Sequence, residues 1–340
     1  MYLSQVVEVA NHDGLKSLYP LKFKPVYKKK VWGGDNIRTY FNRSIKDKKI
    51  GESWEISCRE DGMSVVKNGK FQGKTLLELI NELRDKLLGT EVYKKYGNAF
   101  PLLHKVIDAN ENLSVQVHPD DAYAAAEGKC GKDEMWYIIH ATKNAKLIYG
   151  LIDISKNEFR KVLQEGRISR VLNEVAVKPG DFIFIPGGTV HAILGGLLIA
   201  EIQQNCNTTY RIYDWDRTDG SGKKRELHIE RALDAIRWDK PRPRPAGYSK
   251  TERFGAGALR YGPSIKEFQV FELTTAGEFQ KEADTASFEI LMNLHGSGGI
   301  RYSGGQVDLQ PGDTVLIPAS LGRYSLKGSM KMLLTQMKCT

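Results

Sequence analysis

The sequence predicts a mostly β protein, built from two similar β modules with helical insertions. Short runs of isoleucine, valine, leucine and aromatic residues over 102–117 and 136–151 are typical of neighbouring strands, and they do not alternate with long helices. The second observation is an internal repeat. Lys178–Pro186 recurs as Gln310–Pro318, in each case a Pro-Gly-Asp turn that leads into an apolar strand ending at proline. Two copies of this unit predict two related modules.

The first elements follow from local patterns. Residues 1–17 have no clear periodicity, and we expect an appendage or an extra packed helix there. The alternation over Gly51–Ile56 predicts a strand. Thr75 and Glu78 have the spacing of a capping box, and the leucines and isoleucine that follow recur at helical spacing up to Gly89, a natural end of a helix.

A domain boundary is predicted after the middle of the chain. Apolar residues at helical spacing predict a helix from about Glu226 to Trp238. Pro241, Pro243 and Pro245 follow in alternate positions, which neither a helix nor a central strand accommodates. After them, Ser287–Leu294 and Gln306–Leu326 again resemble short strands between glycine-rich turns. The expected organisation is an appendage at 1–17, a catalytic domain at 18–240, a linker at 241–262 and a C-terminal β module at 263–340.

Composition limits the class of protein. The chain has 340 residues, of which 41% are hydrophobic and 27% charged, so it is long enough for a large core. It has no run of 18 apolar residues and no basic flank with an apolar segment at its start, so we expect no membrane span and a cytoplasmic location. The formal charge of +9 favours anionic partners, but the basic runs are short, so a sugar phosphate is favoured over nucleic acid. Without a C-x-x-C pair, the four cysteines are expected to be free thiols: Cys58, Cys130, Cys206 and Cys339.

The first copy of the repeat carries a metal-binding pattern. Gly180, Pro186, Gly188 and His191 resemble the second motif of the cupins, which are small jelly-roll barrels, although Gly195 stands where that motif has asparagine. The resemblance implies that both modules are cupin-like jelly rolls. In the second copy Arg323 occupies the position of His191, so that module has no metal ligand there.

Two further segments supply candidate ligands for the first module. Gln116 and His118 are two residues apart, and so lie on one face of a strand. Glu134 begins the next apolar strand. Two imidazoles and a carboxylate, with Gln116 as a fourth ligand or as a support for the others, make a plausible zinc site, and the same set also suits iron, manganese or cobalt.

The chain from 18 to 338 resembles the type I mannose-6-phosphate isomerases of the short bacterial kind. Seven segments in the same order carry the resemblance: Val31–Gly34, Gly51–Glu55, Lys105–Val106, Leu113–Asp120, Gly131–Glu134, Pro186–Ala192 and Asn207–Asp214. The resemblance implies interconversion of mannose 6-phosphate and fructose 6-phosphate in the cytoplasm with one zinc ion per chain. Its zinc ligands fall on Gln116, His118, Glu134 and His191, and its active-site arginine falls on Arg211.

The same resemblance suggests roles for further residues. Aldose–ketose isomerisation moves a proton between C1 and C2 through a cis-enediol, so the site needs a proton shuttle and a cation. Arg211 would stabilise the enediolate, and Glu201 or Lys132 would move the proton. Glu201, beside zinc and Arg211, is expected to remain ionised, and a purely structural salt bridge to Arg211 is the alternative role for it. Lys105 and Ser114 are candidate phosphate ligands, and Trp32 is a candidate wall of the substrate tunnel.

Three alternatives stay open from the sequence. Two histidines and one glutamate on a cupin barrel also suit a non-haem iron oxygenase. A non-catalytic sugar-phosphate-binding protein could keep the same residues, and a cupin isomerase could act on glucose 6-phosphate instead. The expected partner is a small sugar phosphate, with neither nucleic acid nor membrane, and the expected assembly is a monomer or a weak homo-oligomer.

Overall fold

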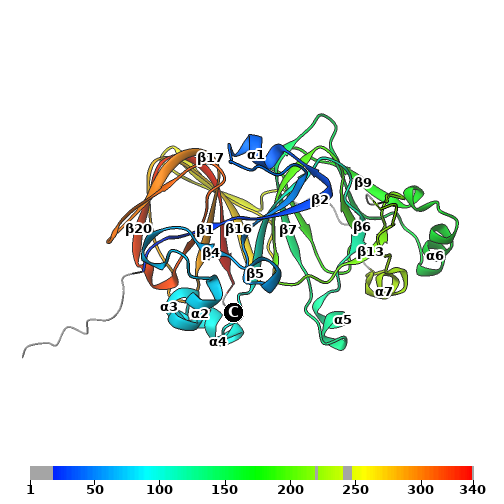
Figure 1. The fold of residues 1–340 in the computed structure, drawn as a ribbon, viewed down its shortest axis with the longest axis horizontal. Coiled ribbons are helices and arrows are strands. Elements are labelled where there is room, and N and C mark those ends of the chain that lie inside the picture. Colours follow the sequence, from blue (N-terminus) through cyan, green and yellow to red (C-terminus); the bar gives the residue numbers. More distant parts are fainter. Residues whose placement is uncertain (1–17, 219–220, 240–246, 339–340) are drawn as a thin grey trace, which may run out of the picture.

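The computed structural model describes residues 18–218, 221–239 and 247–338 (Figure 1). The predictions for residues 1–17, for the three alternate prolines and for Cys339 lie outside these residues. Three antiparallel sheets dominate, as the predicted mostly β class requires. In the described part of the chain, no helix is both long and apolar enough to cross a bilayer.

A six-stranded sheet and a five-stranded sheet pack face to face in the first module. The six-stranded sheet has the spatial order β10 (Phe182–Ile185), β7 (Glu134–Ala141), β12 (Leu197–Gln204), β5 (Leu102–Ala109), β3 (Ile50–Ile56) and β2 (Val26–Gly34). The five-stranded sheet has the order β13 (Tyr210–Tyr213), β6 (Val115–Val117), β11 (His191–Ile193), β8 (Lys146–Leu151) and β9 (Leu172–Ala176). One apolar core joins them, with Trp136 and Ile199 from the first sheet and Leu147 and Ile193 from the second.

The third sheet forms the second module, at the other end of the molecule in Figure 1. Its order is β14 (Lys250–Phe254), β15 (Gly257–Tyr261), β16 (Phe268–Glu282), β20 (Arg323–Met337), β17 (Glu289–Tyr302), β19 (Thr314–Ile317), β1 (Leu21–Lys24) and β4 (Val65–Val66), with β18 (Gly305–Leu309) also paired to β17. Its interior is a separate apolar cluster that includes Leu273, Leu291 and Leu326.

The predicted domain limits differ from this arrangement at two places. Strands β14 and β15 fall within the expected linker 241–262, yet they pair with each other and with β16. Strand β1, from the start of the chain, pairs with β19 through Leu21 and Leu316. Local breaks in the sequence predict these domain limits. Which strand a given strand pairs with, however, depends on residues that are distant in the sequence.

The repeat predicted from the sequence is visible as two equivalent turns and strands. Asp181 Oδ2 accepts a hydrogen bond from the Lys178 backbone N–H at 2.9 Å, and Asp313 Oδ2 accepts one from the Gln310 N–H at 2.9 Å. Gly180 and Gly312 have φ of 93° and 84°, a region that favours glycine. Each turn leads into its predicted strand, β10 or β19.

Helices fill the space beside the sheets. The capping box at Thr75 is present and begins α2 (Leu76–Leu83), but the predicted helix is interrupted at Arg84 and continues as α3 (Asp85–Leu88) and α4 (Thr90–Tyr96). The helix predicted at 226–238 is the shorter α7 (Ile229–Ala235). The other helices are α1 (Asn36–Tyr40), α5 (Asp121–Ala126) and α6 (Lys156–Gln164), and 3₁₀ turns occupy Glu60–Gly62, Gly69–Phe71, Ile168–Arg170 and Ala319–Leu321.

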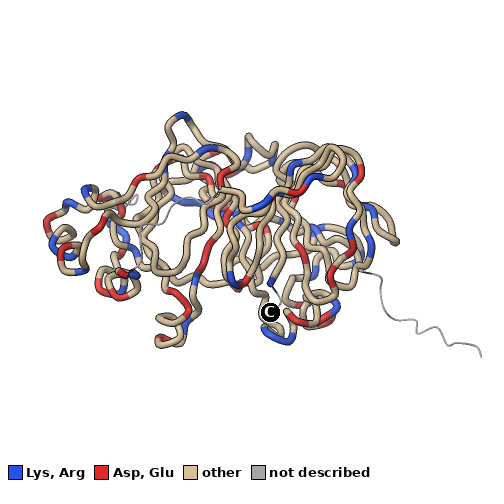
Figure 2. Tube along the Cα trace, turned by 180° about the vertical axis from the view of Figure 1, so that it is seen from behind, with Lys and Arg blue, Asp and Glu red and all other residues tan. Residues whose placement is uncertain are grey.

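A large apolar cluster joins the two modules. Leu79 and Leu88 from the helices, Val106 and Ile202 from the six-stranded sheet, and Ile290 from β17 belong to it. One face of the six-stranded sheet therefore packs on the helices and the second module, and its other face is left for the first module's interior. Acidic and basic residues are interleaved along both modules (Figure 2).

One prediction about the cysteines is wrong. Cys130 and Cys206 form a disulfide with a Cα–Cα distance of 5.9 Å, whereas the sequence suggested free thiols. The two residues are 76 positions apart, so a search for closely spaced pairs does not find them. Cys58 is a free thiol, as predicted.

Candidate active site

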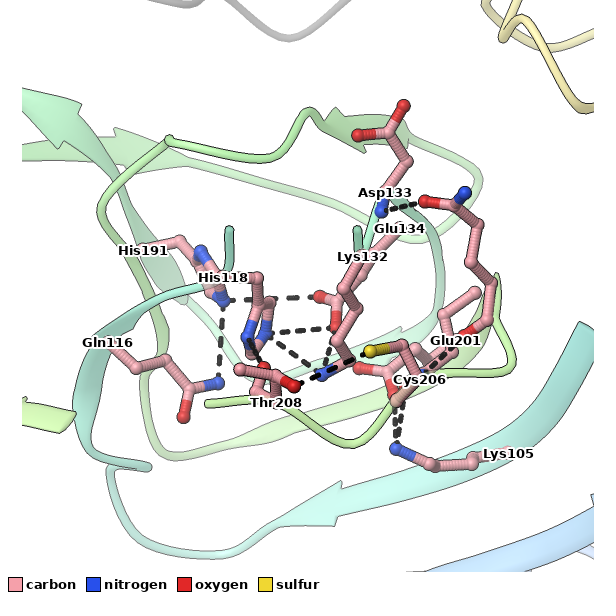
Figure 3. Close-up of polar contacts among 12 residues, drawn as sticks. Lys105, Gln116, His118, Lys132, Asp133, Glu134, His191, Glu201, Cys206 and Thr208 are labelled. Carbon is pink, nitrogen blue, oxygen red and sulfur yellow. Dashed lines mark hydrogen bonds and ion pairs between the residues drawn. The ribbon is translucent and has the colours of Figure 1, made fainter. Parts of the chain in front are cut away.

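Three buried side chains converge between the facing sheets of the first module (Figure 3). His118 directly follows β6 and His191 begins β11, whereas Glu134 begins β7 on the opposite sheet. One potential ligand atom from each lies within 4.8 Å of the others. His118 Nε2 is 3.1 Å from Glu134 Oε1. The structure thus brings together the His, Glu and His that the sequence predicted as metal ligands.

Backbone carbonyls orient both imidazole rings. His118 Nδ1 lies 2.9 Å from the carbonyl oxygen of Thr208, and His191 Nδ1 lies 2.9 Å from that of Thr189. Because a carbonyl oxygen only accepts, each Nδ1 must donate, and in a neutral ring Nε2 then keeps its lone pair. Hydrogen bonds of this kind orient histidine ligands in metal sites. Both rings are therefore arranged to bind a metal through Nε2.

The charge states of His118, His191 and Glu134 also suit metal binding. Burial lowers the pKa of His118 to about 3, with a further contribution from the Lys132 ammonium, and burial also lowers the pKa of His191. For Glu134, burial favours the neutral acid, but Lys132 and the histidines outweigh burial and hold its pKa well below the usual range. At neutral pH the cluster is therefore two neutral imidazoles and one carboxylate, which is a donor set that fits zinc.

Lys132 lies directly beside the cluster. Its Nζ is 2.9 Å from His118 Nε2 and 2.7 Å from Glu134 Oε1. The side chain is only 6% exposed, and its backbone N–H donates to the Pro119 carbonyl at 3.0 Å, which ties the segment before β7 to the segment after β6. The predicted proton-shuttle candidate is thus within hydrogen-bond distance of two candidate ligands.

A row of residues crosses the five-stranded sheet through the site. His191 is opposite Gln116, and Gln116 is opposite Arg211. Residues paired directly in an antiparallel sheet project to the same face, so Arg211 lies on the face that carries His191. Gln116 Nε2 is 3.4 Å from His191 Nε2. The amide is therefore next to the cluster, as a ligand or a supporting group would be.

The Arg211 guanidinium is half-buried. Nη1 donates to the Glu226 carbonyl oxygen at 2.7 Å, and Nε is buried without a hydrogen-bond partner. Burial lowers the arginine pKa, and the nearby Arg225 lowers it further. A partly desolvated cation with a free donor suits an anionic ligand or a developing negative charge.

Glu201 forms its ion pair with Lys105, and not with Arg211 as in the alternative structural role. These two residues are opposite each other on β12 and β5, and Lys105 Nζ is 2.7 Å from Glu201 Oε1 and 2.7 Å from Gln203 Oε1. Among the protein's own groups, the net effect is to raise the pKa of Glu201. Burial raises it, and repulsion from Glu134 adds to burial, which together outweigh the attraction of Lys105.

The other predicted substrate ligands occupy different environments. Lys105 is 7% exposed, and its pKa is raised because Glu201 and Glu52 outweigh the effect of burial. Ser114 is buried, with Oγ 3.4 Å from Gln116 Oε1, so it adjoins the site. Trp32 is 3% exposed and belongs to the apolar core between the sheets. Trp136 of the same core contacts Glu134, and the predicted role of Trp32 as a wall of the substrate tunnel stays a prediction.

Sequence reasoning missed one connecting residue. Trp136 Nε1 lies 3.0 Å from Glu134 Oε2 and 3.2 Å from Glu201 Oε2, so one indole donor joins the metal cluster to the carboxylate of the proton-shuttle candidate. The sequence contains a signal for the contact between Trp136 and Glu134, because residues two apart on one strand share a face. The supporting carbonyl of Thr208 could not be found in this way, since backbone contacts leave no trace in residue type.

Comparisons with known proteins agree on one family. The family model for the catalytic domain of type I phosphomannose isomerase matches residues 20–143, and the model for the cupin domain of mannose-6-phosphate isomerase matches residues 263–337. The mannose-6-phosphate isomerase of Streptococcus mutans is 38% identical over 315 residues, which are 92% of this chain and 97% of that protein. This chain belongs to the mannose-6-phosphate isomerase family.

Solved structures extend the comparison. The mannose-6-phosphate isomerase of Bacillus subtilis matches with a TM-score of 0.85 and 37% identity, over 93% of this chain and 99% of that one. A mannose 6-phosphate isomerase bound with zinc and yttrium shares the fold at a TM-score of 0.73, with 17% identity over 94% of this chain and 99% of that one. The chain is therefore an isomerase of the mannose-6-phosphate isomerase family, with the cupin architecture that the sequence predicted.

Proposed function

We propose that this protein interconverts mannose 6-phosphate and fructose 6-phosphate, with one zinc ion held by His118, Glu134 and His191. The observation that supports zinc is the pair of imidazoles, each with Nδ1 bonded to a carbonyl oxygen and Nε2 directed toward a buried carboxylate. Gln116 would complete the ligand set or support it. When bound, the zinc ion would supply Lewis-acid polarisation of the sugar oxygens.

The proton transfer is assigned to Glu201 or Lys132. Glu201 is buried, its pKa is raised, and Trp136 and Lys105 hold its two oxygens. A carboxylate shifted toward neutrality can both accept and return a proton, which movement between C1 and C2 of the sugar requires. Lys132, beside the ligands, is the second candidate. Arg211 would stabilise the negative charge that develops in the cis-enediol step.

The phosphate group of the substrate would be held by two buried side chains beside the candidate site. Ser114 and Lys105 remain the proposed phosphate ligands, but Lys105 reaches a phosphate only if its contacts with Glu201 and Gln203 open. A cytoplasmic location and a monomeric or weakly oligomeric state remain predictions.

A coupled assay for fructose 6-phosphate tests the proposal. The enzyme is measured as purified, after chelation, and after Zn²⁺, Fe²⁺, Mn²⁺ or Co²⁺ is restored. We expect activity to be lost on chelation and regained with zinc. His191→Ala should abolish activity, whereas the control His140→Ala, on an exposed position of β7, should retain it.

Other outcomes identify the alternatives. Oxygen consumption by the iron form would indicate an oxygenase. Binding of mannose 6-phosphate without turnover by the zinc-loaded enzyme would indicate a binding protein. Faster turnover of glucose 6-phosphate than of mannose 6-phosphate would indicate that glucose 6-phosphate is the substrate. Each of these results would overturn the proposed reaction.

A further inference from the structure

The disulfide joins the two loops that support the metal cluster. Cys130 lies in the segment between α5 and β7, two residues before Lys132 and four before Glu134. Cys206 lies in the segment between β12 and β13, two residues before Thr208, whose carbonyl oxygen orients His118. Figure 3 shows Cys206 close to Thr208 on one side of the cluster. The cross-link therefore lies within a few residues of the proposed ligands on both loops.

The two cysteines differ in access to solvent. Cys130 is exposed, whereas Cys206 is 1% exposed, and its backbone carbonyl accepts a hydrogen bond from Gln203 Nε2 at 2.7 Å. Cys130 is therefore the member of the pair that faces solvent, whereas Cys206 is covered by protein. Thiol–disulfide exchange needs direct attack of one sulfur on another, so the more exposed cysteine, Cys130, should react first with a dissolved reagent.

Noncovalent contacts also hold the loop that carries Cys130, among them the approach of Lys129 Nζ to the Tyr210 hydroxyl at 3.3 Å. Gln204 and Asp133 exchange hydrogen bonds at 2.7 and 3.2 Å close to β7. Nearer to Cys130, the Lys129 N–H bonds to the Ala124 carbonyl within the same segment, and Glu127 accepts from the Tyr210 hydroxyl at 2.7 Å. The disulfide is thus the covalent tie between the exposed part of this loop and the buried segment 205–209.

We propose that Cys130 and Cys206 form a reversible thiol–disulfide modification site, in which a small dissolved disulfide is the oxidant and the cross-link orders the loop before Lys132. Glutathione disulfide serves as the probe of this chemistry. The Cys130 thiolate attacks glutathione disulfide, which forms a mixed disulfide and releases one glutathione thiolate. The Cys206 thiolate then attacks the Cys130 sulfur and releases the second glutathione. The protein loses two electrons and two protons, and glutathione disulfide gains them.

Trapping the intermediates tests this order. Reduced protein is treated with glutathione disulfide, its remaining thiols are alkylated, and the peptides are analysed by mass spectrometry. The natural chain should form the Cys130–Cys206 disulfide. Cys206→Ser should stop at glutathionylated Cys130, and Cys130→Ser should leave Cys206 reduced.

A third cysteine provides the control. Burial raises the pKa of the Cys58 thiol to about 11, so it is almost entirely protonated at neutral pH and reacts slowly. Cys58→Ser should therefore form the disulfide at the same rate as the natural chain. Failure of the disulfide to form, or modification of Cys206 in the Cys130→Ser protein, would overturn the proposed modification.

Hydrogen exchange tests the effect on the site. We expect peptides that cover residues 127–134 to exchange at least fivefold more slowly in the oxidised protein than in the reduced protein. Peptides from β17 serve as the internal control and should not change. Equal exchange of 127–134 in both states would refute the ordering of this loop. Neither readout depends on turnover, so failure of the proposed isomerase activity would be distinguishable from failure of this proposal.

Discussion

Replacement of Lys105 by methionine tests whether its buried ion pair with Glu201 stabilises the fold, a role separate from its proposed contact with the phosphate. Lys105 and Glu201 have side chains only 8% and 5% exposed, and their charged atoms are 2.7 Å apart. Lys105→Met would leave the Glu201 carboxylate buried without its cation. Removal of one partner of a buried ion pair costs about 3–5 kcal/mol, because the remaining charge is uncompensated.

That energy corresponds to a measurable change in melting temperature. For a chain of 340 residues the entropy of unfolding is about 0.7 kcal/mol/K, so Tm should fall by about 4–7 °C. Differential scanning calorimetry of the metal-free proteins measures this change without a contribution from zinc. Lys105→Met combined with Glu201→Met should recover much of the loss, since no charge is then stranded.

A surface pair supplies the matched control. Lys146 and Glu174 are also on neighbouring strands, with Nζ and Oε2 2.8 Å apart, but their side chains are 48% and 51% exposed. Lys146→Met should change the free energy of unfolding by less than about 1 kcal/mol. If Lys105→Met kept the natural Tm and only raised KM for the sugar phosphate, Lys105 would be a phosphate ligand and the argument from the buried pair would be refuted.

Three further predictions concern stability. His104 is 2% exposed, and neither of its ring nitrogens has a hydrogen-bond partner. Burial lowers its pKa to about 3, so between pH 6.5 and pH 3 the unfolded chain binds a proton that the folded chain does not. The free energy of unfolding therefore falls as the pH falls through this range. Between pH 7 and pH 5 the free energy of unfolding, measured with urea, should fall by about 2 kcal/mol less in His104→Leu than in the natural chain. An unchanged pH dependence would contradict this. Thr75→Ala removes the capping box of α2 and should cost about 1 kcal/mol in the same assay, whereas the exposed Leu77→Ala should have a smaller effect. Zinc at about 100 times its Kd should stabilise the metal-free protein by about 2.7 kcal/mol, and His191→Ala should remove that stabilisation; an equal rise in Tm for both proteins would place zinc elsewhere.

Local chemistry in the sequence was enough for much of this protein. The Pro-Gly-Asp turns of the repeat, the capping box at Thr75 and the strand at Gly51–Ile56 were predicted because each depends on residues close together in the chain. The metal ligands were also predictable, since His118, Glu134 and His191 each stand at a strand end and a metal site needs those side-chain types.

Only the tertiary structure decided which distant groups meet. Glu201 pairs with Lys105 because β5 and β12 are neighbours in register, and Cys130 joins Cys206 because two loops meet beside the cluster. Strand β1 completes the second module although it precedes the first along the chain. The physical reason is the same in each case: residue type determines what a side chain can bond to, but strand order and register determine which partner is within reach.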